Sequence, residues 1–262
     1  MKLTGKSRLE TAMPIASLSP KSFIKSHPRV FDATVRVVKR GLLGRRGPLY
    51  DVLDQYSRAR GRRVSFIQIG ANDGLRNDPI REFIVRDQWR GVLIEPLPPV
   101  FEMLRRNYAY LNGSRKLAFE NAAISSSEST LTFYTIADTL LETLPLEEQL
   151  DLLRKSSFSR EHVEQFVGNP ADVVRVEVPC ATVGAIIQRH FPENAIDLLA
   201  IDAEGHEAVI LQSLDFAQAR IGAIMFEALH LEAERKSVFG FLEGHGYTVH
   251  EAGRDAFAVL EK

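Results

Sequence analysis

The sequence has little of the residues that crosslink a chain or carry it through a membrane. Its 262 residues include one cysteine, Cys180, which excludes an internal disulfide and a zinc site built from several cysteines. No apolar run reaches about 18 residues, the length that a membrane-spanning helix needs. The apolar stretch near the N-terminus is broken by Pro14 and Ser17 and makes a poor secretory signal. We therefore expect a cytoplasmic protein.

A dinucleotide-binding glycine fingerprint is also missing. Residues 66–74 read FIQIGANDG, an apolar strand that ends abruptly in small and turn-forming residues. In open α/β sheets such a loop holds nucleotides, because its glycines let the backbone approach the ligand. The Gly-x-Gly-x-x-Gly spacing fails here, since Asn72 stands at the middle glycine and Gly74 comes one residue early. This favours a nucleotide ligand without a pyrophosphate.

Positive charge is concentrated in the first 63 residues. Residues 1–63 hold 15 Lys or Arg and 4 Asp or Glu, whereas residues 64–262 hold 18 and 30. This shift predicts a boundary between a basic N-terminal helical extension (1–63) and an α/β domain (64–262). Helices are expected at about 30–40 and at 49–59. The extension is either a solvated cap or a surface for anionic lipids, which could lie peripherally against the inner membrane.

From residue 64 the chain alternates apolar strands with helices, a pattern typical of a mostly parallel sheet covered on both faces. Its strands are predicted at 64–69, 91–98, 117–125, 196–202 and 221–227, with an antiparallel hairpin at 247–251 and 256–260. Added strands are expected at 131–136 and 173–179. Between these two, a segment rich in Leu, Glu and Lys predicts an inserted helical lid over about residues 138–170. Within this lid, KSSFSR at 155–160 contacts an anionic acceptor or forms a solvated turn, and we favour the turn.

Polar residues follow five of these strands directly. Because ligands bind outside the carboxyl ends of parallel strands, this edge is the expected site. Glu95 lies 25 residues after Gly70, near the offset from which an acid accepts hydrogen bonds from both ribose hydroxyls. Asn121 and Ala122 end the third strand and are small enough to lie against a flat base. The fourth and fifth strands are followed by Asp202, Glu204, His206, Glu227 and His230.

The ordered set of strand-end motifs resembles the FkbM family of S-adenosylmethionine-dependent methyltransferases. The motifs are IQIGANDG (67–74), IEP (94–96), NAAIS (121–125), IDAEGHE (201–207) and FEALHL (226–231). From residue 64 onward, the resemblance implies a class I methyltransferase (Rossmann-like) sheet of strand order 3-2-1-4-5-7-6. It also implies S-adenosyl-L-methionine as cofactor, and O-methylation of a hydroxyl on a sugar, glycan or secondary metabolite. The implied cofactor site comprises Gln68, Gly70, Asn72, Asp73, Gly74, Glu95, Pro96, Asn121, Ala122 and Asp202.

One residue departs from the family pattern. Gln68 stands where an acid often precedes the first glycine, so the negative charge for the cofactor's amino group would come from Asp73 or Asp202. The expected acceptor is a small molecule or glycan. No nucleic-acid partner is expected, because no aromatic-interleaved basic patch accompanies the positive charge.

Methylation of a hydroxyl can require a base, and histidine is the natural one near neutral pH. His206 and His230 are the candidates, and Glu204 and Glu227 could orient a histidine or bind sugar hydroxyls. His206 could instead simply open a helix whose dipole Glu204 and Glu207 complement. Asp202, Glu204, Glu227 and His230 could also converge on Mg²⁺ or Mn²⁺, but their spacing is not diagnostic and we assign no metal site.

Two other functions remain open from the sequence. An NAD(P)-dependent oxidoreductase shares the fold class but needs the pyrophosphate loop that the glycine spacing does not provide. A non-catalytic scaffold of the same fold would not need the cofactor residues Gly70, Gly74 and Glu95. Their presence favours an enzyme.

Overall fold

The computed structural model of the protein describes residues 27–29, 31–32, 47–111 and 116–261, without the side chains of His230 and Glu232. The helix predicted at 30–40 lies outside these residues except for positions 31 and 32. The second predicted helix is confirmed as α3 (Pro48–Ala59), with proline in its first turn, where no hydrogen-bond donor is needed. None of the described helices is both long and apolar enough to cross a membrane.

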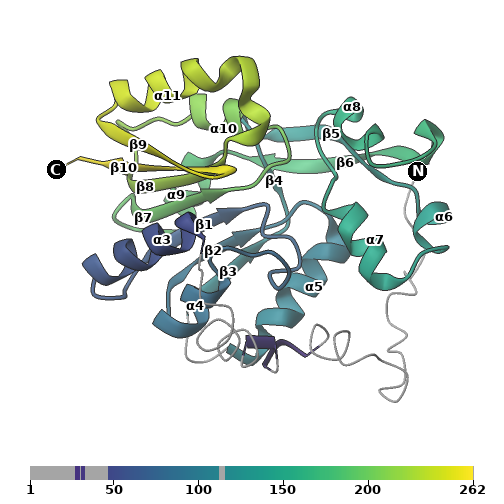
Figure 1. Ribbon diagram of the computed structural model, residues 1–262, viewed down its shortest axis with the longest axis horizontal. Coiled ribbons are helices and arrows are strands. Elements are labelled where there is room, and N and C mark those ends of the chain that lie inside the picture. The colour runs from purple at the N-terminus through teal and green to yellow at the C-terminus, as the bar shows by residue number, and fades with distance from the viewer. Residues whose placement is uncertain (1–26, 30, 33–46, 112–115, 262) are drawn as a thin grey trace.

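A seven-stranded sheet forms the centre of the molecule (Figure 1). β10 runs antiparallel to β8 and β9, whereas the remaining neighbours are parallel. The order is β3-β2-β1-β7-β8-β10-β9, which confirms the predicted order 3-2-1-4-5-7-6 when the strands of this sheet are counted along the chain. The strands are β1 (Ser65–Ile69), β2 (Arg90–Ile94), β3 (Leu117–Glu120), β7 (Ala195–Ile201), β8 (Arg220–Glu227), β9 (Tyr247–Ala252) and β10 (Asp255–Leu260).

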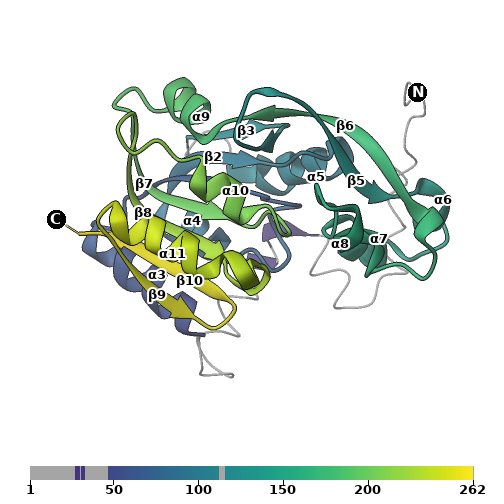
Figure 2. The ribbon, with the colours of Figure 1, turned by 90° about the horizontal axis from the view of Figure 1, so that it is seen from above.

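Helices cover both faces of this sheet (Figures 1 and 2). One face packs against α3, α4 (Arg81–Asp87) and α5 (Pro98–Tyr108), and the other against α9 (Val183–His190), α10 (Glu207–Gln212) and α11 (Arg235–Gly244). Successive side chains of a strand point to opposite faces, so Phe66 belongs to the first core and Ile67 to the second. Short 3₁₀ turns lie at η3 (Ala109–Leu111), η4 (Pro170–Asp172) and η5 (Leu229–Glu234).

The helix α3 and the short segment before it pack on the α/β domain. Leu53 of α3 is fully buried in the same core as Phe66. Asp32 forms a buried ion pair with Arg81 at the start of α4, with Arg81 Nε 2.8 Å from Asp32 Oδ1. Arg81 also donates to the main-chain oxygen of Gly74. The segment at residue 32 is therefore linked through one arginine to the loop that follows β1.

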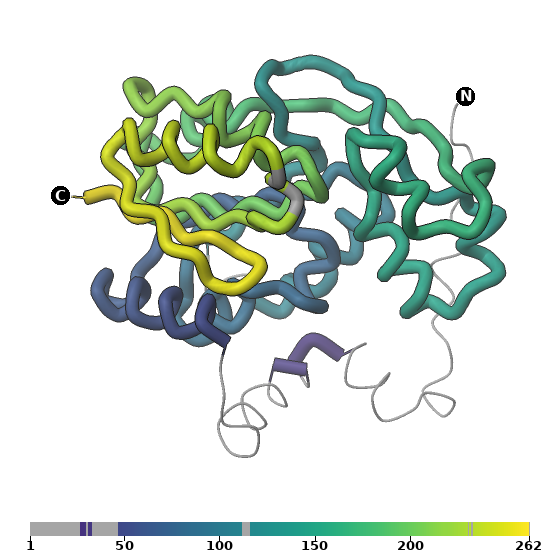
Figure 3. The backbone as a smooth tube through the Cα atoms, turned by 45° about the horizontal axis from the view of Figure 1, so that its top comes forward, coloured from purple at the N-terminus to yellow at the C-terminus, as the bar shows by residue number. Residues whose placement is uncertain are grey.

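A unit inserted between β3 and β7, here called the insertion (residues 123–181), forms a second layer beside the sheet (Figures 2 and 3). It contains its own three-stranded sheet of order β4-β6-β5 and its own apolar core, which includes Phe133, Leu150 and Val163. Its helices fall within the residues predicted as a lid. The elements are β4 (Ala123–Ile124), β5 (Ser129–Ile136), α6 (Asp138–Leu141), α7 (Leu146–Leu153), α8 (Arg160–Glu164) and β6 (Val173–Ala181).

The prediction of a single strand at 117–125 is wrong, because the chain leaves the central sheet halfway through this segment. β3 ends at Glu120, and β4 belongs to the sheet of the insertion. At the turn between them, Asn121 Nδ2 donates to the main-chain oxygens of Glu95 (2.8 Å) and Pro96 (3.0 Å). These bonds hold the turn against the end of β2. A single strand over 117–125 would instead have continued straight along the central sheet.

Candidate functional site

A cavity opens at the carboxyl ends of β1, β2 and β7, where the sheet meets the insertion. This is the edge at which open α/β sheets bind their ligands. The insertion contributes Phe133, Leu153, Arg154, Ser156 and Phe158 to its wall. Of the predicted cofactor residues, those that line the cavity are Gln68, Gly70, Asn72, Glu95, Pro96, Ala122 and Asp202.

The loop after β1 turns sharply against the end of β7. Gly70 has φ +69°, and a Cβ at this position would lie 1.8 Å from the main-chain oxygen of Asp202. Only glycine fits so close an approach in this left-handed conformation. Asn72 is also left-handed, with φ +51°, and its main-chain N–H donates to Glu95 Oε2 at 3.1 Å. The loop is thus held between two neighbouring strand ends.

Asp73 and Gly74 shape this loop without lining the cavity. The Asp73 carboxylate accepts hydrogen bonds from the N–H groups of Leu75 (2.9 Å) and Arg76 (3.0 Å) and from Arg76 Nη1 (2.5 Å). A Cβ on Gly74 would lie 2.5 Å from the side chains of Leu104 and Tyr108, so the loop packs directly on α5. Asp73 is 1% exposed and uses its charge inside the loop.

Glu95 presents a buried carboxylate to the cavity. Its Oε1 accepts from the N–H of Leu97 (3.0 Å) and its Oε2 from that of Asn72 (3.1 Å). Burial raises the pKa of Glu95 to about 7, with the charges of Asp202 and Asp73 adding to the rise and the two backbone hydrogen bonds opposing it. Each oxygen can accept a further hydrogen bond, which suits a ligand with two adjacent hydroxyls.

Gln68 offers an unused hydrogen-bond acceptor. Its Nε2 donates to Asp78 Oδ1 at 3.2 Å, which fixes the orientation of the amide. Its Oε1 is buried and has no hydrogen-bond partner among the described residues. A buried acceptor is rarely left unpaired, so this oxygen is available to a donor on a ligand or to a water molecule.

Glu204 lines the cavity, but its carboxylate is bound by side chains of the insertion. Its carboxylate accepts from Lys155 Nζ at 2.8 and 3.0 Å and lies 3.1 Å from His162 Nε2. Burial would raise the pKa of Glu204, but the hydrogen bonds and charges of His162 and Lys155 outweigh it and lower the pKa below its usual value. Ser157 Oγ donates to the Glu204 main-chain oxygen at 2.7 Å. These contacts hold the loop after β7 against the insertion.

The segment KSSFSR at 155–160 is part of this contact. Ser156 and Ser157 are buried, and Phe158 lines the cavity. The solvated turn favoured for this segment was therefore wrong. Its polar composition gave no indication that the serines and Lys155 bind the loop after β7 rather than water.

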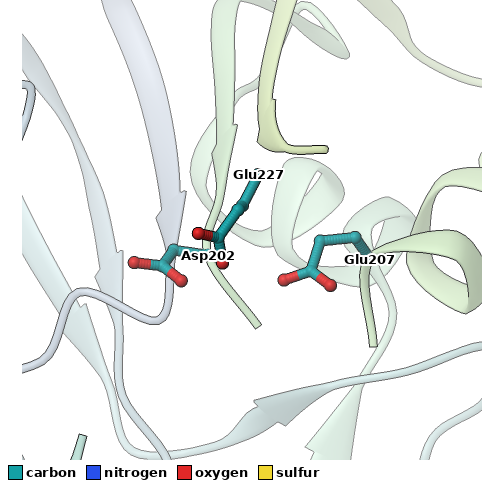
Figure 4. Close-up of side chains that lie close together, drawn as sticks. All are labelled: Asp202, Glu207 and Glu227. Carbon is teal, nitrogen blue, oxygen red and sulfur yellow. The ribbon is translucent and has the colours of Figure 1, made fainter. Parts of the chain in front are cut away.

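Three carboxylates lie close together at the ends of β7 and β8 and the start of α10 (Figure 4). One oxygen each of Asp202, Glu207 and Glu227 lies within 4.8 Å of the others. Both oxygens of Glu207 accept backbone N–H groups (2.7 and 3.0 Å), and Glu227 pairs with Arg254 at 2.5 Å. Glu207 and Glu227 therefore already have protein partners. Glu207 was not in the predicted set of Asp202, Glu204, Glu227 and His230. Glu204, which was, binds Lys155 and His162 instead.

Within this cluster only Asp202 lines the cavity. Its surface is exposed there, while the protein atoms around it partly desolvate the carboxylate. This desolvation, together with the negative charges of Glu204, Glu227 and Glu207, raises the pKa of Asp202 to about 7. Burial likewise raises the pKa of Glu207 to about 7. Asp202 is therefore a carboxyl group that can gain or lose a proton near neutral pH.

The structure places His206 behind the cavity wall. It precedes α10, its Nε2 lies 3.1 Å from Ser125 Oγ, and its ring centroid lies 4.3 Å from that of Phe158. Burial lowers the pKa of His206, so its ring is neutral at pH 7. The main chain of His230 lies in η5, and its side chain lies outside the described residues. Of the four predicted catalytic residues, Glu204 lines the cavity and Glu227 joins the carboxylate cluster.

Two arginines of the cavity wall were not predicted. Arg76 follows the glycine loop by two residues, and Arg154 comes from the insertion. A charged residue so close after a ligand-binding loop is a signal that could have identified Arg76. No sequence signal pointed to Arg154, because its place at the cavity depends on how the insertion packs.

A known protein family matches most of the chain, whereas the solved structures resemble it only distantly. The methyltransferase FkbM domain matches residues 68–249. No curated protein matches significantly. Among solved structures, methyltransferase FkbM from Methylobacillus flagellatus KT is 11% identical, with a TM-score of 0.43 over 76% of this chain and 44% of its own. A putative caffeoyl-CoA O-methyltransferase from Staphylococcus aureus is 10% identical, with a TM-score of 0.42 over 89% and 92%.

Similarities this distant carry no argument about activity, and the chain spans less than half the length of the Methylobacillus protein. The domain match is different, because it covers more than half of the chain and includes the loops after β1, β2, β7 and β8. The protein therefore belongs to the FkbM methyltransferase family.

Proposed function

We propose that this methyltransferase uses S-adenosyl-L-methionine to methylate a hydroxyl group on a sugar, glycan or secondary metabolite. The observation that carries the proposal is that Gln68, Gly70 and Glu95 line one cavity, where Gln68 Oε1 has no partner among the described residues. Glu95 suits the two hydroxyls of a ribose. Gln68 Oε1 suits a cationic amino group, although it provides no charge of its own.

The residues present fit this cofactor in other respects. Ala122 is a small apolar residue of the wall and leaves room for a flat base. The loop has Asn72 in place of the middle glycine that would let the backbone approach a pyrophosphate, which argues against the NAD(P) alternative. A scaffold without a ligand would have no use for a buried, unpaired acceptor at Gln68.

The bound cofactor would supply an electrophilic methyl group. The chain must then hold the acceptor oxygen in line with that group and accept its proton. We assign the proton to Asp202, because it opens into the cavity and its pKa lies near 7. Glu204 is a weaker base, since its contacts with His162 and Lys155 lower the pKa of its carboxyl group.

The acceptor would lie against the insertion. There Phe133 and Phe158 form an edge-to-face pair with centroids 5.0 Å apart, beside Ser156 and Arg154. Apolar ring surface next to hydrogen-bonding groups suits a compound that has both an apolar face and hydroxyls. This supports a sugar-like or metabolite acceptor of modest size.

Binding and turnover test the proposal separately. We expect S-adenosylhomocysteine to bind in isothermal titration and to bind more weakly to Glu95→Ala.

A radiolabelled methyl donor should label hydroxyl-bearing acceptors. Asp202→Asn should lower kcat by about 10²–10⁴-fold and remove the limb of the pH–rate profile near pH 7 while leaving cofactor binding intact. Asp51→Asn, on the exposed side of α3, is the matched control and should behave as wild type. Binding of NAD(P) without S-adenosylhomocysteine, or label on nitrogen only, would contradict the proposal.

A further inference from the structure

Arg76 carries the second unpartnered polar atom of the cavity wall. Its Nε is buried and has no hydrogen-bond partner among the described residues. The side chain is 13% exposed and lines the cavity with Gln68. A buried guanidinium N–H without an acceptor is unfavourable, so this atom indicates an acceptor on a bound ligand.

Asp73 in the loop holds Arg76 in place through Nη1, away from the unpartnered Nε. Asp73 Oδ2 lies 2.5 Å from Arg76 Nη1, and Asp73 Oδ1 accepts from the main-chain N–H of Arg76 at 3.0 Å. The edge formed by Nε and Nη2 is not used by Asp73. Two parallel N–H donors on that edge match the two oxygens of a carboxylate.

The unpartnered atoms of Arg76 and Gln68 are of opposite kind. Gln68 Oε1 is an acceptor and Arg76 Nε is a donor. Both side chains are anchored in the same stretch, because Gln68 Nε2 binds Asp78 Oδ1 (3.2 Å) and Asp78 follows Arg76 by two residues. An α-amino acid group presents an ammonium and a carboxylate on one carbon atom. An acceptor and a donor on the wall of one cavity suit such a zwitterion.

We propose that Arg76 binds the α-carboxylate of the methionine portion of the cofactor, with Gln68 Oε1 receiving the α-ammonium group. This inference rests on the proposed function and extends it to a residue outside the predicted site. Because Asp73 fixes Arg76, that acidic residue acts as a positioning residue for the carboxylate contact instead of meeting the ammonium group itself.

Ligands that lack parts of the amino acid group test the assignment by binding alone. S-adenosylhomocysteine has both groups, decarboxylated S-adenosylmethionine has the ammonium only, and 5′-methylthioadenosine has neither. We expect Arg76→Leu to weaken S-adenosylhomocysteine binding by about 10- to 100-fold, the range for a hydrogen-bonded charge pair. Binding of decarboxylated S-adenosylmethionine and 5′-methylthioadenosine should be unchanged. Arg76→Lys, which keeps the charge but not the two-pronged geometry, should recover part of the loss.

Arg105→Leu is the matched control, since Arg105 lies on the surface of α5 and pairs only with exposed Glu102 in the described part of the chain. It should bind all three ligands as wild type does. Equal losses for all three ligands in Arg76→Leu would overturn the inference, because they would indicate a collapsed loop. Unchanged S-adenosylhomocysteine binding with a raised KM for the acceptor would also overturn it, since Arg76 would then serve the acceptor. If wild type binds none of the three ligands, the proposed function fails first.

Discussion

Replacing Gly70 with alanine tests the closest approach in the site. The new Cβ would lie 1.8 Å from the main-chain oxygen of Asp202, so the ends of β1 and β7 would have to separate. The left-handed φ of +69° adds about 1–2 kcal/mol of strain for any residue with a Cβ. Forcing an extra methyl group into a packed site adds about 1–3 kcal/mol. We therefore expect Gly70→Ala to lower the free energy of unfolding by about 2–5 kcal/mol.

Gly253→Ala separates the two contributions. Gly253 has φ +78° at the turn between β9 and β10, but no atom lies within 4 Å of where its Cβ would be. This variant should lose only the strain of about 1–2 kcal/mol. Urea unfolding followed by fluorescence provides the assay, because Trp89 is the only tryptophan and is fully buried, stacked on Phe83. If the two variants are destabilised equally, the backbone contact between Gly70 and Asp202 does not exist as described.

Three further predictions concern stability and surface binding. Asp32→Ala should lower the free energy of unfolding by about 3–5 kcal/mol in urea, because it leaves the Arg81 guanidinium buried and unpaired, and Asp32→Ala/Arg81→Met should recover part of this loss. Glu95 and Glu207 have folded pKa values raised to about 7, so they bind protons more tightly when folded, and the stability this contributes is lost as pH rises through 7. Between pH 6 and 8, urea titrations should show a fall of about 1 kcal/mol for each of these carboxyls, and a rise in stability over this range would refute the assignment. Residues 1–63, with 15 basic and 4 acidic side chains, should sediment the protein with anionic but not neutral vesicles, and 0.5 M salt should release it.

The sheet was predictable because its strands are apolar on both faces and its polar residues follow strand ends. The same reasoning found the loop after β1 and Glu95, whose positions depend on strand order alone. It failed at residues 117–125, where every residue is compatible with a strand and the break depends on the bonds that Asn121 makes to the end of β2. The sequence also does not reveal that Lys155 folds back onto the candidate residue Glu204 across 49 residues.

The candidate base illustrates a second limit of sequence reasoning. His206 and Asp202 both follow β7, and histidine has the more suitable pKa in isolation. Burial reverses this order: it lowers the pKa of His206, whereas the pKa of Asp202 rises to about 7 beside three other carboxylates. Only the three-dimensional arrangement of charges decides which residue titrates near neutrality.

The last strand along the chain occupies an interior position of the sheet, and this constrains how the protein can be made and trimmed. β10 pairs with β8 on one side and β9 on the other, although both of these strands precede it in the chain. A nascent chain cannot complete the sheet until residues 255–260 have emerged from the ribosome. A fragment restricted to residues 68–249 would leave the edge of β8 open and Phe226 beside a missing neighbour, Ala256, which invites pairing with other chains. Recombinant versions should therefore retain the full C-terminal hairpin.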